Sequence, residues 1–68
     1  MGAGSLYDNL VLTHISSLIA DAATAHRSIQ VLKEARTIVG RYPKTEMTEE
    51  QVALAIIHLA AKGGVQVN

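Results

Sequence analysis

Hydrophobic side chains in the first forty positions recur every seven residues, at spacings that alternate between four and three. Neither glycine nor proline interrupts the chain between Ser5 and Val39. Alternating spacings of this kind mark one face of an α-helix, and a sustained heptad repeat is typical of helices that pack along a shared seam. The stripe consists of Val11, Ile15, Leu18, Ala22, Ala25, Ile29, Leu32 and Val39.

The stripe leaves two arrangements open for residues 6–39. The simplest is one long N-terminal helix, which would measure roughly 50 Å at ~1.5 Å per residue. Such a helix would far exceed the mean length of ~11–12 residues, and its centre holds two possible N-cap residues, Asp21 and Thr24. The alternative is therefore an αα-hairpin with helices over 6–20 and about 25–39. Neither cap candidate is followed by Glu or Gln at the third position, and no glycine ends the first helix.

A second helix is predicted over 49–62, where start and stop signals agree. Thr48 and Gln51 have the spacing of a capping box, and two glutamates in the first turn suit the helix dipole. Lys62 falls in the last turn, and Gly63 is placed to adopt the left-handed conformation that ends a helix. The interior is apolar on nearly every side, so this helix requires burial against more than one neighbour.

The remaining segments are predicted to be non-helical. Gly40 and Pro43 end the upstream helix and open a polar connection over 41–47. The tail, 63–68, alternates apolar and polar residues, so we expect an extended segment, either unpaired or pairing as an edge strand across a dimer. Residues 1–5 are expected to be disordered. Ser5, the last of them, can serve as the N-cap of the first helix.

Length and composition indicate that the chain needs a partner. A chain of 68 residues forms one domain at most and buries a small core, and it has no cysteine for disulfides or thiolate metal sites. Hydrophobic residues nevertheless make up 49% of it. We therefore expect an all-α helical bundle completed by homodimerisation, with the heptad stripe as the interface and the 49–62 helix folded over it. Four alanines at the centre of the stripe (20, 22, 23 and 25) would let two helices approach closely.

The charges cancel over the whole chain, with six basic and six acidic residues, which lowers the expectation of nucleic-acid binding. Five cations nevertheless gather in the middle of the sequence, relieved only by Glu34. A solvated helix face explains them, and the functional alternative is a patch for an anion, RNA or a protein partner. The helix over 49–62 begins acidic and is apolar, so it does not suit a DNA groove. The cations are Arg27, Lys33, Arg36, Arg41 and Lys44.

No pattern in the sequence indicates catalysis, a cofactor or a metal. His14, His26 and His58 are dispersed, and none has a second histidine or a carboxylate at the helical spacing of a metal pair. Each histidine can be a locally bonded side chain or a pH-sensitive contact, and the sequence does not decide between these roles. Ser16 and Ser17 lie near His14, but no glycine-rich turn would expose a nucleophile there.

These observations lead to two functional hypotheses. The first is a small, non-catalytic helical module for oligomerisation or protein interaction. The alternative is a nucleic-acid-binding regulator that uses the basic segment 27–44. The uncharged runs, 9–20 and 51–61, are shorter than the ~20 residues of a membrane span, and no basic segment precedes a hydrophobic one at the N-terminus. We therefore expect a cytoplasmic protein without a membrane segment.

Overall fold

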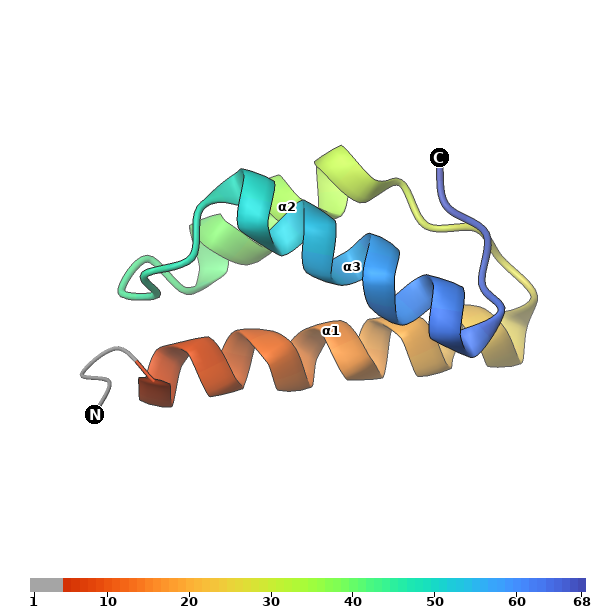
Figure 1. Cartoon of the computed structure of the whole chain (residues 1–68), viewed down its shortest axis with the longest axis horizontal. Helices are drawn as coiled ribbons and strands as arrows, with labels where there is room; N and C mark the ends of the chain where they lie inside the picture. Colours follow the sequence, from red (N-terminus) through yellow and green to blue (C-terminus); the bar gives the residue numbers. More distant parts are fainter. Residues whose placement is uncertain (1–4) are drawn as a thin grey trace.

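The computed structural model describes residues 5–68, and these form three α-helices: α1 (Ser5–Ala25), α2 (Val31–Arg41) and α3 (Glu49–Gly63). Helix α1 runs the length of the molecule, while α2 and α3 lie on one side of it as an antiparallel pair (Figure 1). This arrangement confirms the predicted all-α bundle. Residues 1–4 and the side chain of Ser5 lie outside the described part, as do the expectations for that segment.

The structure corrects the interpretation of 6–39 as one continuous helix. The chain leaves the helix after Ala25, later than either predicted cap at the centre of the stripe. His26 adopts the left-handed conformation with φ of 57°. Its amide donates to Ala23 O at 3.3 Å, and the Arg27 amide donates to Ala22 O at 2.9 Å, which together make a Schellman motif. A histidine therefore occupies a position that usually holds glycine, and for this reason no glycine signalled the end of α1.

The C-terminal tail pairs with the loop between α1 and α2 of the same chain. The Ile29 amide donates to Gln66 O at 3.0 Å, and the Asn68 amide donates back to Ile29 O at 2.8 Å, forming a parallel bridge between Ile29 and Val67. The Val31 amide donates to Asn68 O at 3.2 Å. The tail is extended, as predicted, and its hydrogen-bond partner is its own chain.

Helix α3 follows its sequence signals closely. The Gln51 amide donates to Thr48 Oγ1 at 3.1 Å, and the Thr48 amide donates to Gln51 Oε1 at 3.0 Å, which confirms the capping box. The helix continues one residue further than predicted, and Gly64, with φ of 72°, is the left-handed residue beyond its end. The following amide, of Val65, donates to Ala60 O at 2.9 Å.

The connection between α2 and α3 is fastened to α1 by a single carboxylate. The Thr45 hydroxyl and the Glu46 amide both donate to Asp8 Oδ1, the second at 3.1 Å. Because Asp8 lies in the first turn of α1, this arrangement holds the start of α1 against the loop that leads into α3.

The core lies where the three helices meet and contains only apolar side chains among the described residues. Helix α1 contributes one face of four residues, and α3 contributes the face that packs on both neighbours. The loop residue Ile29 also belongs to the core, and its backbone pairs with the tail. The buried residues are Val11, Ile15, Ile19, Ala22, Ile29, Val31, Ala35, Ile38, Val52, Ala53, Ile56 and Ala60.

Candidate interaction surface

Half of the predicted interface stripe is already covered within one copy of the chain. Four of its eight residues, Val11, Ile15, Ala22 and Ile29, are 3% exposed or less. Leu18 and Val39 are partly buried against the same core, whereas Ala25 and Leu32 are exposed. The stripe therefore builds the core of the single chain, and Leu32 is its one large side chain that another molecule can cover. The role of the stripe as an oligomer interface stays a prediction.

The outer side of α2 and α3 carries large apolar side chains that the chain does not cover. Leu32 on α2 is 74% exposed, Leu54 on α3 is 61% exposed, and Ile57 on α3 is 43% exposed. We call these three residues the α2–α3 face. The sequence predicts a helix that is apolar on nearly every side, but periodicity does not reveal which of its residues remain outside. Burial of 52, 53, 56 and 60 leaves Leu54 and Ile57 on the outward flank.

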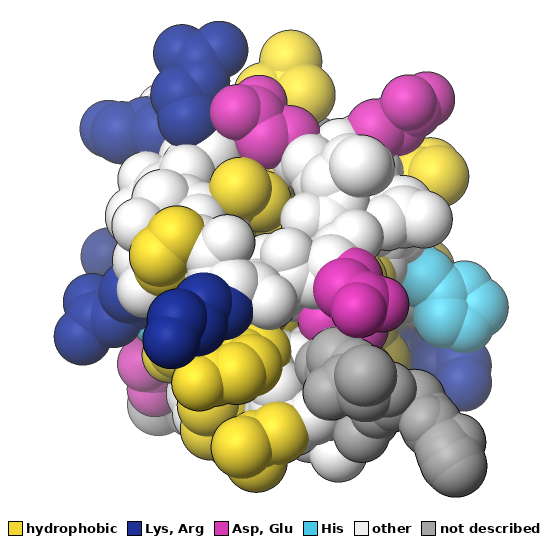
Figure 2. Space-filling model, turned by 90° about the vertical axis from the view of Figure 1, so that its left-hand side faces the viewer, with side chains coloured by type: hydrophobic (Ala, Val, Ile, Leu, Met, Phe, Trp, Pro, Cys, Tyr) yellow, Lys and Arg dark blue, Asp and Glu magenta, His cyan; other side chains and the backbone are white. Residues whose placement is uncertain are grey.

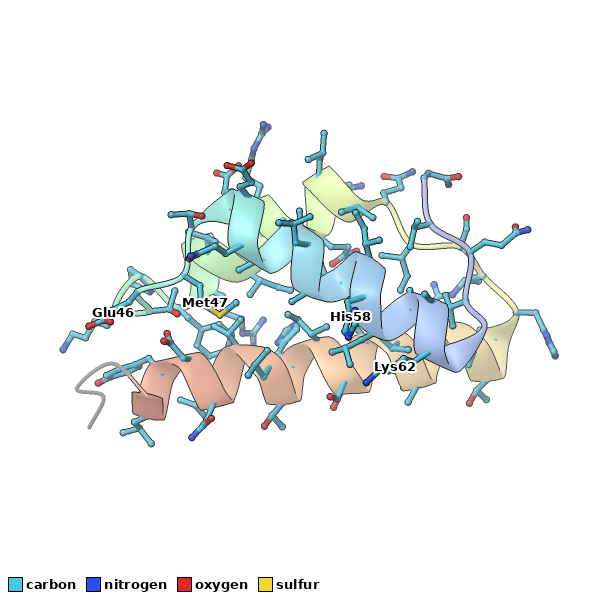
Figure 3. All side chains as sticks on the ribbon, in the orientation of Figure 1. Glu46, Met47, His58 and Lys62 are labelled. Carbon is cyan, nitrogen blue, oxygen red and sulfur yellow. The ribbon has the colours of Figure 1, made fainter. Side chains whose placement is uncertain are left out.

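An ion pair marks where the two helices lie beside each other. Arg36 Nε is 3.9 Å from Glu49 Oε1, and the two helices run in opposite directions (Figure 1). One turn back along α2 from Arg36 is Leu32, and one to two turns forward along α3 from Glu49 is the segment 53–57. Leu32 therefore lies level with α3 near Ala53, about one turn before the exposed Ile57. Figure 3 shows side chains projecting from this outer side of α2 and α3, away from α1.

Charges of both signs border the α2–α3 face. Lys33 and Arg36 are exposed on α2, next to Leu32 and one turn beyond it. Glu49 and Glu50 are exposed at the start of α3, and Glu50 lies one turn before Leu54. The exposed Arg36–Glu49 pair contributes little to stability, because surface ion pairs are worth about 0–1 kcal/mol. The pair matters because it shows how charge is arranged around the α2–α3 face. The apolar side chains are flanked by cations on α2 and by anions on α3.

The five cations predicted as a patch are spread along the molecule. Arg27 follows α1 and lines a pocket beside the tail, whereas Arg41 and Lys44 line a groove at the far end of α2. Helix α2 separates these sites by about 16 Å, at ~1.5 Å per residue. Figure 2 shows lysine and arginine side chains distributed around this end of the molecule with acidic and neutral side chains among them. Of the five cations, the structure places Arg41 and Lys44 on one groove. Lys33 and Arg36 lie apart from that groove on α2.

The three histidines have three different surroundings. His14 Nδ1 lies 3.3 Å from Tyr42 Oη, and the two rings meet edge to face with centroids 5.8 Å apart. His26 is the left-handed residue that ends α1. His58 is exposed on α3, one turn from Lys62, and both side chains lie on the side of α3 near α1 (Figure 3). No group of three or more metal-binding side chains gathers anywhere in residues 5–68.

Comparison with other proteins adds no functional information to this geometry. Within residues 5–68, every helix falls short of the combination of length and hydropathy that a bilayer crossing requires. No protein-family model matches the chain, and no curated protein or solved structure matches it either.

Proposed function

We propose that this chain is a small, non-catalytic helical module that associates with a second copy of itself through the α2–α3 face. The observation that carries the proposal is the exposure of Leu32 and Leu54, at 74% and 61%, on two adjacent helices. Scattered apolar side chains are normal on a protein surface, but large ones on neighbouring helices form the kind of patch that marks an interaction site.

The charges around this face favour a second copy over an unrelated protein. A two-fold symmetric interface uses the same surface on both subunits, so that surface must be complementary to itself. Arg36 and Glu49 already pair within each copy, and this leaves Lys33 of one copy to meet Glu50 of the other. The zero net charge of the chain also means that two copies do not repel each other overall.

The size of the chain points in the same direction. Small domains without disulfides or metals often gain stability by oligomerisation, since a single small core supplies only ~3–5 kcal/mol. A standard interface covers about 800 Å² on each partner. That area is roughly a sixth of the 4589 Å² surface of this chain.

Sedimentation equilibrium over a range of micromolar concentrations tests the proposal. The unmodified chain should dimerise, and Leu32→Ser and Leu54→Ser should each weaken the dimer. Full burial of a leucine is worth ~1.5–3 kcal/mol, and association can still cover about two thirds of each of these side chains, which are 74% and 61% exposed. A symmetric interface counts each substitution twice, so each should cost ~2–4 kcal/mol and raise the dissociation constant roughly 30- to 1000-fold.

The matched control is Leu6→Ser, which changes a leucine that is 64% exposed at the start of α1, away from the α2–α3 face. It should leave the dissociation constant unchanged. A chain that remains monomeric at about 0.1 mM, or a dimer that Leu6→Ser weakens as much as Leu32→Ser does, would overturn the proposal.

A further inference from the structure

A separate groove lies between the start of α1 and the end of α2, and it contains both aromatic rings of the chain. The sequence has two tyrosines and neither phenylalanine nor tryptophan. Both tyrosines line this groove, although they are far apart in the sequence. We call it the tyrosine groove, and its lining residues are Tyr7, Leu10, Arg41, Tyr42, Pro43 and Lys44.

The walls of the groove are held in place by contacts with the rest of the fold. Tyr42 is partly buried against the core, and its hydroxyl is within 3.3 Å of His14 Nδ1 on α1. The loop that follows is tied to α1 by Asp8, which accepts hydrogen bonds from the Thr45 hydroxyl and the Glu46 amide. Helix α1 and the α2–α3 loop are therefore fixed relative to each other, so the groove exists before any ligand arrives.

The charge of the lining is positive. Lys44 Nζ lies 6.0 Å from the centroid of the Tyr7 ring, and Arg41 is exposed on the same lining. No carboxylate lines the groove; the nearest one in sequence, Asp8, lies beside it, where it accepts hydrogen bonds from the loop and keeps its negative charge. Within residues 5–68 the one ion pair joins Arg36 to Glu49, so neither Arg41 nor Lys44 is neutralised by a carboxylate.

We propose that the tyrosine groove binds an aromatic ring that bears a phosphate group, the chemistry shared by a mononucleotide and a single-stranded oligonucleotide. The flat body of the ligand takes the place of the Lys44 ammonium over the Tyr7 ring and packs against Pro43, because aromatic bases stack on tyrosine regardless of their identity. The phosphate lies between Lys44 and Arg41, since charge-assisted hydrogen bonds from arginine and lysine are the usual partners of phosphate oxygens. This site is independent of the α2–α3 face.

Titration of the ¹⁵N-labelled full chain, followed by NMR, tests this site with three probes: 5′-AMP, inorganic phosphate and hexauridylate. We expect 5′-AMP to cause saturable shifts in the amides of 7–10 and 41–45, and inorganic phosphate to bind at least about tenfold more weakly. Tighter binding of hexauridylate than of 5′-AMP would identify a single-stranded nucleic acid as the source of the ligand, whereas equal affinity would identify a mononucleotide.

Two variants and a matched control locate the interaction. Lys44→Gln and Tyr7→Leu should each weaken 5′-AMP binding at least about fivefold, while Lys33→Gln, which removes an exposed lysine of α2 outside the groove, should leave it unchanged. If Tyr7→Leu disturbs the fold, as its own spectrum would reveal, Lys44→Gln and Arg41→Gln decide the matter. The absence of saturable shifts at ~10 mM, or equal losses in Lys33→Gln and Lys44→Gln, would overturn the proposal.

Discussion

Replacing His26 with glycine should make the chain more stable. His26 has φ of 57°, in the left-handed region where the Cβ of an ordinary residue approaches the following carbonyl oxygen. Its conformation is imposed by the Schellman motif that ends α1, in which the amides of His26 and Arg27 bond to carbonyls of the last turn. Glycine accepts this conformation without strain, so His26→Gly keeps both hydrogen bonds and removes the steric cost.

The size of the effect follows from two opposing terms. The left-handed conformation costs an L-residue ~1–2 kcal/mol, whereas the greater freedom of glycine in the unfolded chain costs ~0.5–1 kcal/mol. The imidazole is exposed and makes no side-chain hydrogen bond among the described residues, so its removal loses little. The net gain in the free energy of unfolding should be about 0.5–1 kcal/mol, which corresponds to a rise of about 2–8 °C in Tm for a chain of this size.

Urea denaturation followed by circular dichroism measures this difference directly. Gly64→Ala tests the same strain in the opposite direction, because it places an ordinary residue where glycine now stands. Gly64 occupies the equivalent position after α3, with φ of 72°. A Cβ at Gly64 would meet nothing within 4 Å, so the substitution perturbs only the backbone conformation and should cost about 1 kcal/mol. If His26→Gly lowers stability while Gly64→Ala leaves it unchanged, the explanation based on backbone strain is refuted.

Two further predictions concern the ends of α3. Thr48→Ala removes one half of the capping box and should lower the free energy of unfolding by ~0.5–2 kcal/mol in the same urea assay, whereas an unchanged midpoint would mean that the cap contributes nothing. Deleting residues 66–68 removes the segment that pairs with Ile29 and leaves the Ile29 and Val31 amides without their acceptors. Hydrogen exchange at these two amides should then become fast, and exchange as slow as in the full chain would contradict the pairing.

The elements that the sequence predicted well are those whose signals are local. Helix α3 begins at its capping box and ends one residue beyond the predicted boundary, because Thr48, Gln51 and the glycines after Lys62 act within a few positions of one another. The break after α1 had no such signal. Its left-handed residue is a histidine, and the heptad phase continues through the loop because Ile29 is also a core residue.

The candidate sites depend on packing between distant segments, which periodicity does not encode. The heptad pattern identified Leu32 as an interface residue, and it is indeed exposed, but the pattern did not distinguish it from Val11 or Ile15, which the same chain buries. The apolar composition of α3 likewise gave no reason to place Leu54 outside rather than inside. Tyr7 and Tyr42 line one groove only because the end of α2 returns to the start of α1.

The contact between the tail and the α1–α2 loop has a consequence for how the molecule folds. Asn68 bonds to Ser28 across 40 positions of sequence, so this contact must wait for a large loop to close, whereas each helix can form from neighbouring residues alone. Before the tail pairs with it, the α1–α2 loop lacks the hydrogen bonds from Ile29 and Val31 to the tail, so we expect this loop to become ordered late in folding.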